Sequence, residues 1–411
     1  MRTRRKSDRY LTAREAAAAL NISLSTLYSY VSRGMLRSEP VAGNPRERRY
    51  WQEDVVRLAE RKELRRDPAK AAARSLRWGA PVLDSSITLI DGGRLYYRGR
   101  DALELAQKAS VEEVAALLWN GDLKDSEHLF AKHSEGLSPE IYDLLKRIKR
   151  NTELGPVERC QLALSLRSAT DPGAYDLRSV AVARTGARIL DVMIASVCGV
   201  STAGSADVSL RKAWLPRHKA AAPALRAALI LCADHELNVS AFTARCIASA
   251  RATPYEVVIG ALAAMKGRRH GGHTLEVESL FLEAGGGRRP REVLANRLRL
   301  GERLPGFGHP LYPQGDPRAG LLLSFAKKLG REPVWELAAK MVETVRSLTG
   351  EHPTVDFALV TLARSLGLPA ESPLALFSLG RTIGWIAHAI EQYADDQLIR
   401  PRARYTGRAP E

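Results

Sequence analysis

The stretch Gly306-Phe307-Gly308-His309, followed by Asp316-Pro317-Arg318, fits neither a helical nor a strand period. A second stretch, Arg269-His270-Gly271-Gly272, has the same character, because an imidazole again stands beside glycine. Glycine offers no side chain to pack and costs backbone entropy, so these histidines are poor core residues. They suit a site where backbone closely approaches a ligand while an imidazole donates or accepts a proton. The two stretches therefore predict an active site.

Charged residues in the same half of the chain extend this candidate site. Val355-Asp356-Phe357 sets a carboxylate between apolar neighbours, where desolvation can raise its pKa toward that of a useful base. Arg318, Arg381 and Arg400 are permanent cations suited to gripping carboxylates. Asp316-Pro317 predicts a helix start, whose dipole also favours anions. Together with the two histidines, they indicate an enzyme that enolises one substrate and adds it to a polyanionic acceptor.

The length and composition limit the classes of protein to which the chain can belong. A chain of 411 residues with 45% hydrophobic residues is expected to form two or three domains. No apolar run reaches the roughly 18 residues that span a bilayer, and the basic residues 1–6 are not followed by the apolar segment of a secretory signal. Four cysteines stand singly, without metal-ligand spacing, as reduced thiols of a cytoplasmic protein do: Cys160, Cys198, Cys232 and Cys246. We expect neither a metal nor a membrane segment.

The net charge of +16 is unevenly placed. Residues 1–80 hold 19 Lys and Arg against 9 Asp and Glu, a net charge of +10. Basic charge concentrated in one terminal module is typical of proteins that bind a polyanion, most often nucleic acid. A surface that merely aids solubility is the alternative interpretation.

The residues of this module predict two short helices and a wing. Thr12-Ala13-Arg14-Glu15 is a capping box that opens a small-residue helix. A turn at residues 21–23 then leads into a helix over 24–32, a spacing typical of a helix-turn-helix. The following segment predicts two short strands and a third helix, at residues 35–37, 48–51 and 54–62.

This module resembles the winged helix-turn-helix of the MerR/excisionase type over residues 10–66, behind a basic arm. The resemblance makes eight residues candidates for DNA contact: Ser25, Thr26, Tyr28, Ser29, Arg33, Arg46, Arg48 and Arg49. A small helical module that only mediates assembly is the alternative, since a fold does not by itself determine function. Residues 67–79 are interpreted as a linker, which places the first domain at 1–66.

From about residue 81 onward helical patterns dominate. Ser110-Val111-Glu112-Glu113 is a capping box for a helix that stops at Asn120-Gly121. Two strands, 86–90 and 94–97, flank Asp91-Gly92-Gly93 and predict a hairpin. Nine further helices are expected, at residues 156–167, 177–200, 221–233, 240–250, 255–266, 317–329, 333–348, 355–366 and 373–396. The region is predicted to be mainly α with a small β element.

Residues 80–411 resemble the citrate synthases, including the related methylcitrate synthases. The matching stretches follow the family's order: 86–99, 110–121, 233–238, the two histidine stretches, 355–357, 380–388 and 400–402. The resemblance implies a homodimer with shared active sites. It also implies a large helical domain, residues 80–271 and 368–411, interrupted by a smaller one, residues 272–367, that closes over the substrates.

The resemblance further implies a condensation of acetyl-CoA, or a related acyl-CoA such as propionyl-CoA, with oxaloacetate to citrate or 2-methylcitrate. Asp356 would be the base that removes a proton from the acyl-CoA. His270 would stabilise the enolate by a hydrogen bond to the thioester oxygen, and His309 would polarise and protonate the oxaloacetate ketone. The thioester is itself a substrate, so no cofactor is expected.

The same resemblance assigns acceptor binding to His235, Arg318, Arg381 and, from the partner subunit, Arg400. Each has a structural alternative when its residue is taken alone. His235 could cap or brace a helix, Asp356 could be an N-cap, and Arg381 could be a buried ion-pair partner. Arg400 could be one charge of a basic tail.

The chain also departs from the family pattern. His273-Thr274 stands where the family usually has Ala-Asn, and Arg268-Arg269 where it has Pro-Leu. Pro310 replaces the arginine that usually follows His309. These changes alter the walls of the predicted pocket, so the acyl-CoA preference stays open. His273 and His388 are not needed for the mechanism and are interpreted as structural.

Two functions compete. One is the condensing acyltransferase; the other is a DNA-binding transcription regulator that uses the same scaffold to sense a dicarboxylate or an acyl-CoA. The complete set of His270, His309 and Asp356 favours the enzyme, because a sensor need not keep a base. The N-terminal module favours regulation, at least as a second activity.

Overall fold

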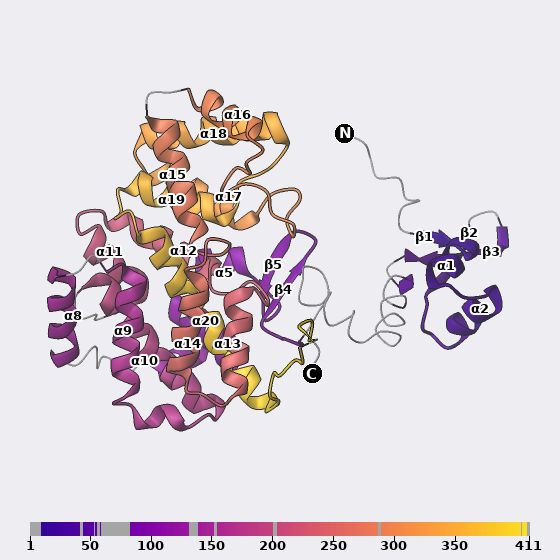
Figure 1. Cartoon of the computed structure of the whole chain (residues 1–411), viewed down its shortest axis with the longest axis horizontal. Coiled ribbons are helices and arrows are strands. Elements are labelled where there is room, and N and C mark those ends of the chain that lie inside the picture. Colours follow the sequence, from indigo (N-terminus) through magenta and orange to yellow (C-terminus); the bar gives the residue numbers. More distant parts are fainter. Residues whose placement is uncertain are drawn as a thin grey trace. The chain divides into compact units, whose positions relative to one another are not determined.

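The computed structural model describes residues 10–41, 44–52, 54–55, 58, 83–130, 139–151, 154–199, 204–286, 289–403 and 405–408. The chain divides into two compact units, Met1–Asp84 and Ser85–Glu411 (Figure 1). The predicted basic arm, the linker at 67–79 and most of the predicted helix at 54–62 lie outside the described residues.

The N-terminal unit is a small α/β module. Its elements are β1 (Tyr10–Thr12), α1 (Ala13–Leu20), α2 (Leu24–Ser32), β2 (Ser38–Val41) and β3 (Asn44–Trp51), with the strands in the antiparallel order β1-β3-β2. The capping box is confirmed: the amide of Thr12 donates to the Glu15 carboxylate at 2.8 Å, and the Glu15 amide donates back to the Thr12 hydroxyl. Asn21, at a φ of 50°, ends α1, and Ser23 caps α2.

A separate hydrophobic core holds this unit together. It consists of Ala16, Ala17, Leu20, Leu27, Leu36, Tyr50 and Val55. The strand predicted at 35–37 is wrong, because Leu36 turns into this core and the amide of Arg37 donates to the side chain of Asp54 at 2.9 Å. The strand β2 begins at Ser38, three residues after the predicted start.

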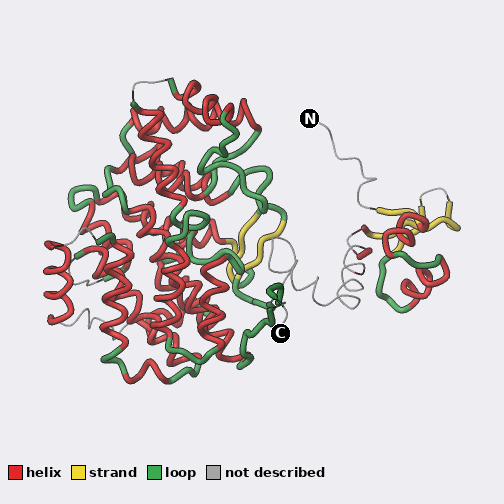
Figure 2. Tube along the Cα trace, in the orientation of Figure 1, coloured by secondary structure: helices red, strands yellow, loops and turns green. Residues whose placement is uncertain are grey.

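The C-terminal unit is dominated by helices (Figure 2). They are α5 (Ala102–Lys108), α6 (Val111–Asn120), α7 (Ser126–Phe130), α8 (Pro139–Asn151), α9 (Pro156–Ser168), α10 (Ser179–Cys198), α11 (Ala206–Trp214), α12 (Ala222–Leu231), α13 (Val239–Ser249), α14 (Pro254–Met265), α15 (His273–Gly285), α16 (Pro290–Arg299), α17 (Pro317–Leu329), α18 (Glu332–Thr349), α19 (Val355–Leu366) and α20 (Ser372–Asp395). Three short 3-10 turns lie between them: η2 (Leu123–Asp125), η3 (Pro172–Tyr175) and η4 (Lys219–Ala221). The nine helices expected from periodicity are confirmed, with their ends shifted by about two residues at most.

The predicted hairpin forms β4 (Thr88–Asp91) and β5 (Arg94–Tyr97), which pair antiparallel across Asp91-Gly92-Gly93. A third strand, β6 (Arg100–Asp101), extends this sheet in the order β4-β5-β6. The alternating side chains Leu95 and Tyr97 face the core and are fully buried.

Two hydrophobic cores divide the helices of this unit, and α19 belongs to both. Ala358 and Leu359 pack in the larger core, which is built around α6, α10, α12, α14 and α20. Phe357 and Val360 pack in the smaller core with α15, α16 and α18, which gather at one end of the unit (Figure 1). Asp356, in the first turn of α19, therefore lies where the two cores meet.

Helix α20 runs through the larger core and packs against α10, α12, α13 and α14. Gly380 and Gly384 allow it to approach the end of α12 closely, since a Cβ at either position would collide with a backbone carbonyl of the segment 229–233. This close contact brings Arg381 and His388, which α20 also carries, against that segment.

All four cysteines are free thiols. Burial raises the pKa of Cys160, Cys198 and Cys232 to about 12, so these thiols stay protonated at neutral pH. Within the described ranges, no helix combines the length and the apolar character that crossing a bilayer requires.

Candidate active site

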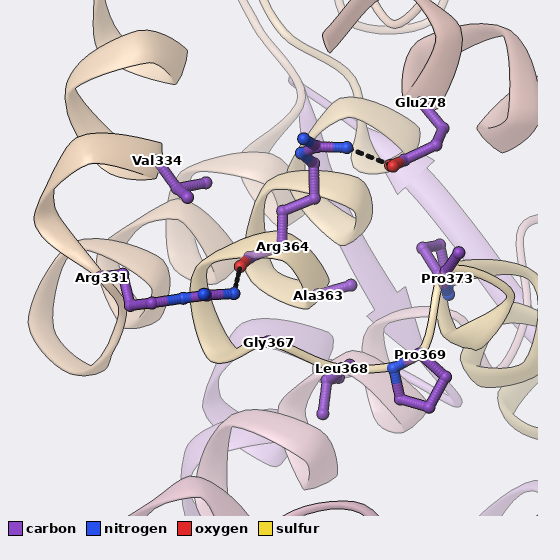
Figure 3. Close-up of a pocket in the computed structure, with 10 residues that line it drawn as sticks. Glu278, Arg331, Val334, Ala363, Arg364, Gly367, Leu368, Pro369 and Pro373 are labelled. Atoms are coloured by element: carbon purple, nitrogen blue, oxygen red, sulfur yellow. Dashed lines mark hydrogen bonds and ion pairs between the residues drawn. The ribbon is translucent and has the colours of Figure 1, made fainter. Parts of the chain in front are cut away.

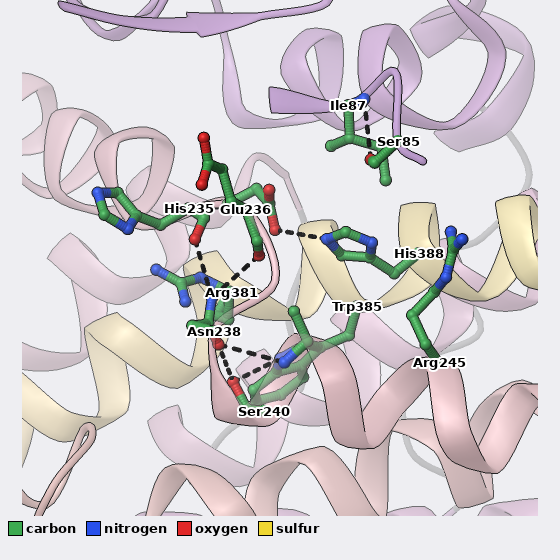
Figure 4. Close-up of polar contacts among 12 residues, drawn as sticks. Ser85, Ile87, His235, Glu236, Asn238, Ser240, Arg245, Arg381, Trp385 and His388 are labelled. Carbon is green, nitrogen blue, oxygen red and sulfur yellow. Dashed lines mark hydrogen bonds and ion pairs between the residues drawn. The ribbon is translucent and has the colours of Figure 1, made fainter. Parts of the chain in front are cut away.

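The turn between α12 and α13, residues 232–238, carries His235 and Glu236 (Figure 4). The Tyr97 hydroxyl donates to the carbonyl of Asp234 at 3.2 Å, and the side chains of Asp234 and His388 lie 3.2 Å apart with no exposed surface. Glu236 adopts a left-handed φ of 52°, which is uncommon for a residue with a side chain. His388 thus braces the turn, as the sequence interpretation proposed.

His235 projects from this turn into a cluster of three rings. Its Nε2 lies 3.1 Å from the hydroxyl of Tyr312, and its ring meets that of His309 edge-on at 5.2 Å between centroids. Burial, then the positive charges of Arg318 and Arg381, lower the pKa of His235 well below its usual value. The imidazole is therefore neutral near pH 7 and can donate one hydrogen bond to an anion.

Arg318 is buried at the start of α17, where only 2% of its side chain is exposed. Its Nε and Nη2 donate to the two oxygens of Asp316 at 2.9 and 2.8 Å, and its amide donates to the same carboxylate, which caps the helix. Burial lowers the pKa of Arg318, but the Asp316 carboxylate outweighs burial and raises it above the usual value. Asp316 also accepts the amide of Val355 at 3.1 Å, which ties the start of α17 to the start of α19.

Arg381 is equally buried but has a different environment. Its Nε donates to the carbonyl of Cys232 at 2.7 Å, and its guanidinium lies over the ring of Phe377. Among the described residues, it forms no ion pair with a carboxylate, and burial lowers its pKa. Figure 4 shows its guanidinium and the ring of His235 on the same side of the 232–238 turn. Arg381 is thus a buried cation that forms no ion pair in the described part of the chain, and the charge of Asp234 acts on it without a salt bridge.

His270 lies in the loop after α14. Its Nε2 is 2.7 Å from the hydroxyl of Ser240, which also accepts the indole N–H of Trp385 at 3.0 Å and donates to the side-chain oxygen of Asn238 at 2.8 Å. Burial, then the charge of Arg381, lowers the pKa of His270 to about 3. The ring is neutral at physiological pH, and Ser240 sets which nitrogen carries its proton.

His309 is half-buried at the end of its glycine stretch. Its Nδ1 accepts the amide of Leu311 at 3.2 Å, so the proton of the neutral ring is on Nε2. Burial, followed by the charge of Arg318, lowers the pKa of His309. A neutral ring with a fixed Nε2–H is a hydrogen-bond donor that can also release its proton.

Asp356 and the His309 stretch are held together by backbone pairing. Gly308 donates its amide to the carbonyl of His352 at 3.0 Å, and Thr354 donates its amide to the carbonyl of Gly306 at 2.8 Å. Burial raises the pKa of Asp356 above its usual value. A carboxylate with a raised pKa is a stronger base than an exposed aspartate.

The capping and ion-pair alternatives for these residues do not match the geometry, whereas the basic-tail alternative for Arg400 does. The N-cap of α19 is Thr354 and not Asp356, and the N-cap of α13 is Asn238 and not His235. The ion-pair interpretation of Arg381 fails within the described residues, as shown above. Arg400 lies exposed in the segment after α20 and forms no hydrogen bond to a described residue of this chain.

Tyr312 and Ser240 are site residues that sequence reasoning did not identify. Tyr312 contacts both His235 and His309 through its ring, and its hydroxyl has a pKa raised to about 12, mainly by burial. Ser240 is only the second residue of a helix in the sequence. Neither residue has a local pattern that marks it, because its partner lies 77 or 30 positions away.

The DNA-contact candidates lie in the N-terminal unit. On α2, Ser25, Ser29 and Arg33 are exposed, Tyr28 is 53% exposed and Thr26 is half-buried. On β3, Arg48 is exposed, but Arg49 donates to Glu39 at 2.7 Å and lies over the ring of Tyr10. The side chain of Arg46 lies outside the described residues.

A cavity of about 330 Å³ lies at the other end of α19 from Asp356 (Figure 3). Arg331, Arg364 and Glu278 line it together with apolar side chains, and Arg364 is ion-paired with Glu278. The cavity is therefore separate from the histidine and arginine cluster. In the described ranges, no group of three or more His, Cys, Asp or Glu residues could hold a metal ion.

Comparison with known proteins identifies relatives of this architecture. The family model described as "Citrate synthase, C-terminal domain" matches residues 75–402. The citrate synthase of Haloferax volcanii is 32% identical, with 80% of this chain and 94% of that protein covered. A 2-methylcitrate synthase of Mycobacterium tuberculosis is 31% identical, with 76% and 84% covered. The solved ternary complex of carboxymethyl coenzyme A and oxaloacetate with the Thermoplasma acidophilum citrate synthase superposes with a TM-score of 0.70 at 26% identity, covering 82% of this chain and 97% of that one.

Proposed function

The chain belongs to the citrate synthase family and is an acyltransferase, and we propose that it condenses an acyl-CoA with oxaloacetate to citrate or a 2-alkylcitrate, releasing CoA. The reaction needs no cofactor beyond the CoA thioester itself. The relatives include both citrate synthases and 2-methylcitrate synthases, so acetyl-CoA and propionyl-CoA are the first donors to test.

The observation that carries this proposal is the unpaired, buried guanidinium of Arg381 beside neutral His235. A buried charge without a partner is costly, so the site favours an incoming anion. Arg318 is already paired with Asp316, but its Nη1 donates to no described residue and remains for a second carboxylate. Two arginines and one neutral imidazole suit a dicarboxylate such as oxaloacetate.

Deprotonation of the acyl-CoA is assigned to Asp356. Its raised pKa makes it a competent base once it is ionised. His270 is neutral, and we assign it donation to the thioester oxygen through Nδ1, which requires Ser240 to turn its single proton from Asn238 Oδ1 to Nε2 of His270 when substrate binds. Ser240 then still accepts the indole N–H of Trp385. The developing enolate is stabilised by a neutral donor, which costs no prior protonation of the ring.

Carbon–carbon bond formation is assigned to His309 on the acceptor side. The proton on Nε2 faces away from the Leu311 amide and can be donated to the ketone oxygen of oxaloacetate. As the enolate carbon attacks the ketone carbon, the ketone oxygen gains electron density and takes this proton. Hydrolysis of the resulting thioester by water releases CoA and the tricarboxylate.

Arg400 completes the acceptor site from a second subunit in this proposal. Its exposed position in the C-terminal segment, away from His235 and Arg318, fits a side chain that acts on a partner copy of the chain. We accordingly infer a homodimer with shared sites. We also propose that residues 272–367, which contain the smaller core, close over the substrates.

The test is an assay of CoA release from acetyl-, propionyl- and longer acyl-CoAs, each with and without oxaloacetate. The proposal expects release that depends on oxaloacetate and a ranking of donors by kcat/KM. Equal release with and without oxaloacetate would mean thioester hydrolysis instead, and would overturn the condensation.

We propose duplex DNA binding as a second activity, carried by the N-terminal unit as a winged helix-turn-helix. Two helices joined by a three-residue turn, a separate core and an exposed α2 face support it. Of the wing arginines with described side chains, Arg48 is available for phosphate, whereas Arg49 is engaged by Glu39. Regulation by a bound metabolite would follow if substrate binding changed DNA affinity.

A further inference from the structure

His273 is a residue of this chain where the family pattern has alanine. It is the first residue of α15 and stands three positions after His270. A histidine at the start of a helix can simply face solvent, but this side chain is half-buried and both ring nitrogens have partners. The function proposed above does not assign it a role.

The two partners of His273 define its hydrogen-bonding state. Its Nε2 accepts the backbone N–H of Gly306 at 3.1 Å, and its Nδ1 lies 3.1 Å from Oε2 of Glu276. Because a backbone amide can only donate, Nε2 carries no proton, and Nδ1–H donates to the carboxylate. Glu276 is in turn held by Arg268, whose Nε donates to its other oxygen at 3.0 Å.

Gly306 is the point at which the three catalytic segments meet. Its carbonyl accepts the amide of Thr354 at 2.8 Å and the Thr354 hydroxyl at 3.2 Å, so it is joined to the start of α19. It adopts a φ of 85°, and a Cβ there would collide with Phe357 and Val277. The N–H of Gly306 faces His273, and its chain continues to His309 three residues later.

We propose that His273 is a positioning residue: it fastens the His309 loop to the start of α15, and so fixes the spacing of His270, His309 and Asp356. The His270 loop leads directly into His273, while Gly306 connects to His309 on one side and to Thr354 on the other. The side chain of His273 therefore connects, through Gly306, the segments that carry all three groups.

The experiment compares three substitutions in the full chain. Gln places a carbonyl oxygen near the position of Nε2 and can still accept the Gly306 amide, whereas Asn is too short and Ala has no acceptor. We expect His273→Ala and His273→Asn to lower kcat about 10- to 100-fold, the usual cost of a small misplacement of reacting groups. His273→Gln should recover most of kcat. KM for oxaloacetate should change little, since His235, Arg318 and Arg381 do not contact His273.

His128→Ala is the matched control, because this exposed histidine of α7 forms no hydrogen bond to a described residue. Melting temperatures of all variants should stay within about 4 °C of the parent, as expected when one hydrogen bond is lost. Equal kcat in the Ala, Asn and Gln variants would overturn the proposal. So would a loss of kcat that follows melting temperature and is not recovered by Gln.

A second measurement does not depend on activity. Hydrogen exchange of a peptide covering residues 304–309 should be faster in the Ala and Asn variants than in the parent and the Gln variant, because Gly306 loses its acceptor. Only the expected changes in kcat rest on the proposed function; the exchange measurement does not. If the parent protein has no condensing activity, the proposed function fails, while the exchange pattern still decides whether His273 holds the loop.

Discussion

The two units of this chain bury different kinds of side chain. Among the described residues of the N-terminal unit, Asp54 is the one buried charged or polar side chain, and it is paired with Arg37. The C-terminal unit buries the neutral His235 and two arginines, Arg318 and Arg381, and Arg381 forms no ion pair with a described carboxylate. Since burying charge is costly, the second pattern persists only where ligand binding or catalysis uses it. In our proposal the C-terminal unit binds its substrates at buried side chains, whereas the N-terminal unit would contact DNA at its surface.

The largest effect expected in the C-terminal unit comes from its base. Asp356→Asn keeps the shape of the side chain and removes the base, so kcat should fall by at least about 100-fold. Oxaloacetate affinity should stay nearly unchanged, because the carboxylate-binding residues are untouched. Steady-state CoA release and oxaloacetate titration measure the two quantities. Near-parental turnover would show that another group removes the proton.

The pH profile of the parent enzyme provides a second test of Asp356 as the base. A base with a raised pKa is ionised only above that pKa, so kcat/KM should fall as pH decreases, and it should do so at a higher pH than an ordinary aspartate would give. His270 has a pKa of about 3 and should not contribute between pH 5 and 8. An acid limb that persists unchanged in a variant with residual activity, Asp356→Glu, would point to a different titrating group.

A matched pair of substitutions distinguishes the contributions of the two buried arginines to stability and to oxaloacetate binding. Arg318→Met leaves the Asp316 carboxylate buried without its partner and should lower the free energy of unfolding by about 3–5 kcal/mol. Arg381→Met removes an unpaired cation and should leave unliganded stability unchanged or raised. Arg381→Met should nonetheless weaken oxaloacetate binding about 10- to 100-fold, as the loss of a charged hydrogen bond does. Denaturant unfolding and ligand titration test both halves. Equal destabilisation by the two substitutions would contradict the distinction.

Mixing subunits tests whether Arg400 acts on the partner. In a random mixture of Arg400→Ala and His309→Ala chains, half of the dimers are mixed and one of their two sites is intact, so about a quarter of parental activity should return. Each variant alone should be nearly inactive. If subunit exchange is demonstrated by mass and activity does not return, the site is made within one chain.

The smallest effects are expected at the surface of the N-terminal unit. Duplex binding should fall steeply with salt and should be lost in a protein lacking residues 1–66, because released counterions drive such binding. Arg48→Ala should reduce the salt slope by about one, whereas Arg49→Ala should change it less, since Arg49 is engaged by Glu39. Tyr28→Ala should alter sequence preference instead. Salt-titrated mobility shifts measure these effects. Identical salt slopes for the truncated and complete proteins would contradict DNA binding by this unit and would favour a purely structural role.

Some elements were predicted correctly from the sequence and others were not, and the difference has a physical reason. Helices such as 317–329 and 355–366 were placed correctly because periodicity, caps and proline act within a few residues. The expected strand at 35–37 failed because tertiary contacts of Leu36 and Arg37 outweighed local preference. Helix α15 was missed because its first turn follows the glycines of the His270 stretch, which interrupt the local pattern.

The amino-acid sequence alone determined the helical class, the family and the chemical types available to the site, because glycine-flanked histidines and isolated charges are local features. The tertiary structure decided how these groups interact. It paired Arg318 with Asp316 and left Arg381 without a carboxylate among the described residues, although both are arginines near the start or middle of a helix. It also brought Ser240 to His270 and His273 to Gly306. The partners of His270 and His273 are set by packing between distant segments, whereas Asp316 lies only two residues before Arg318. Burial then changes the energy of every charge and hydrogen bond in the site.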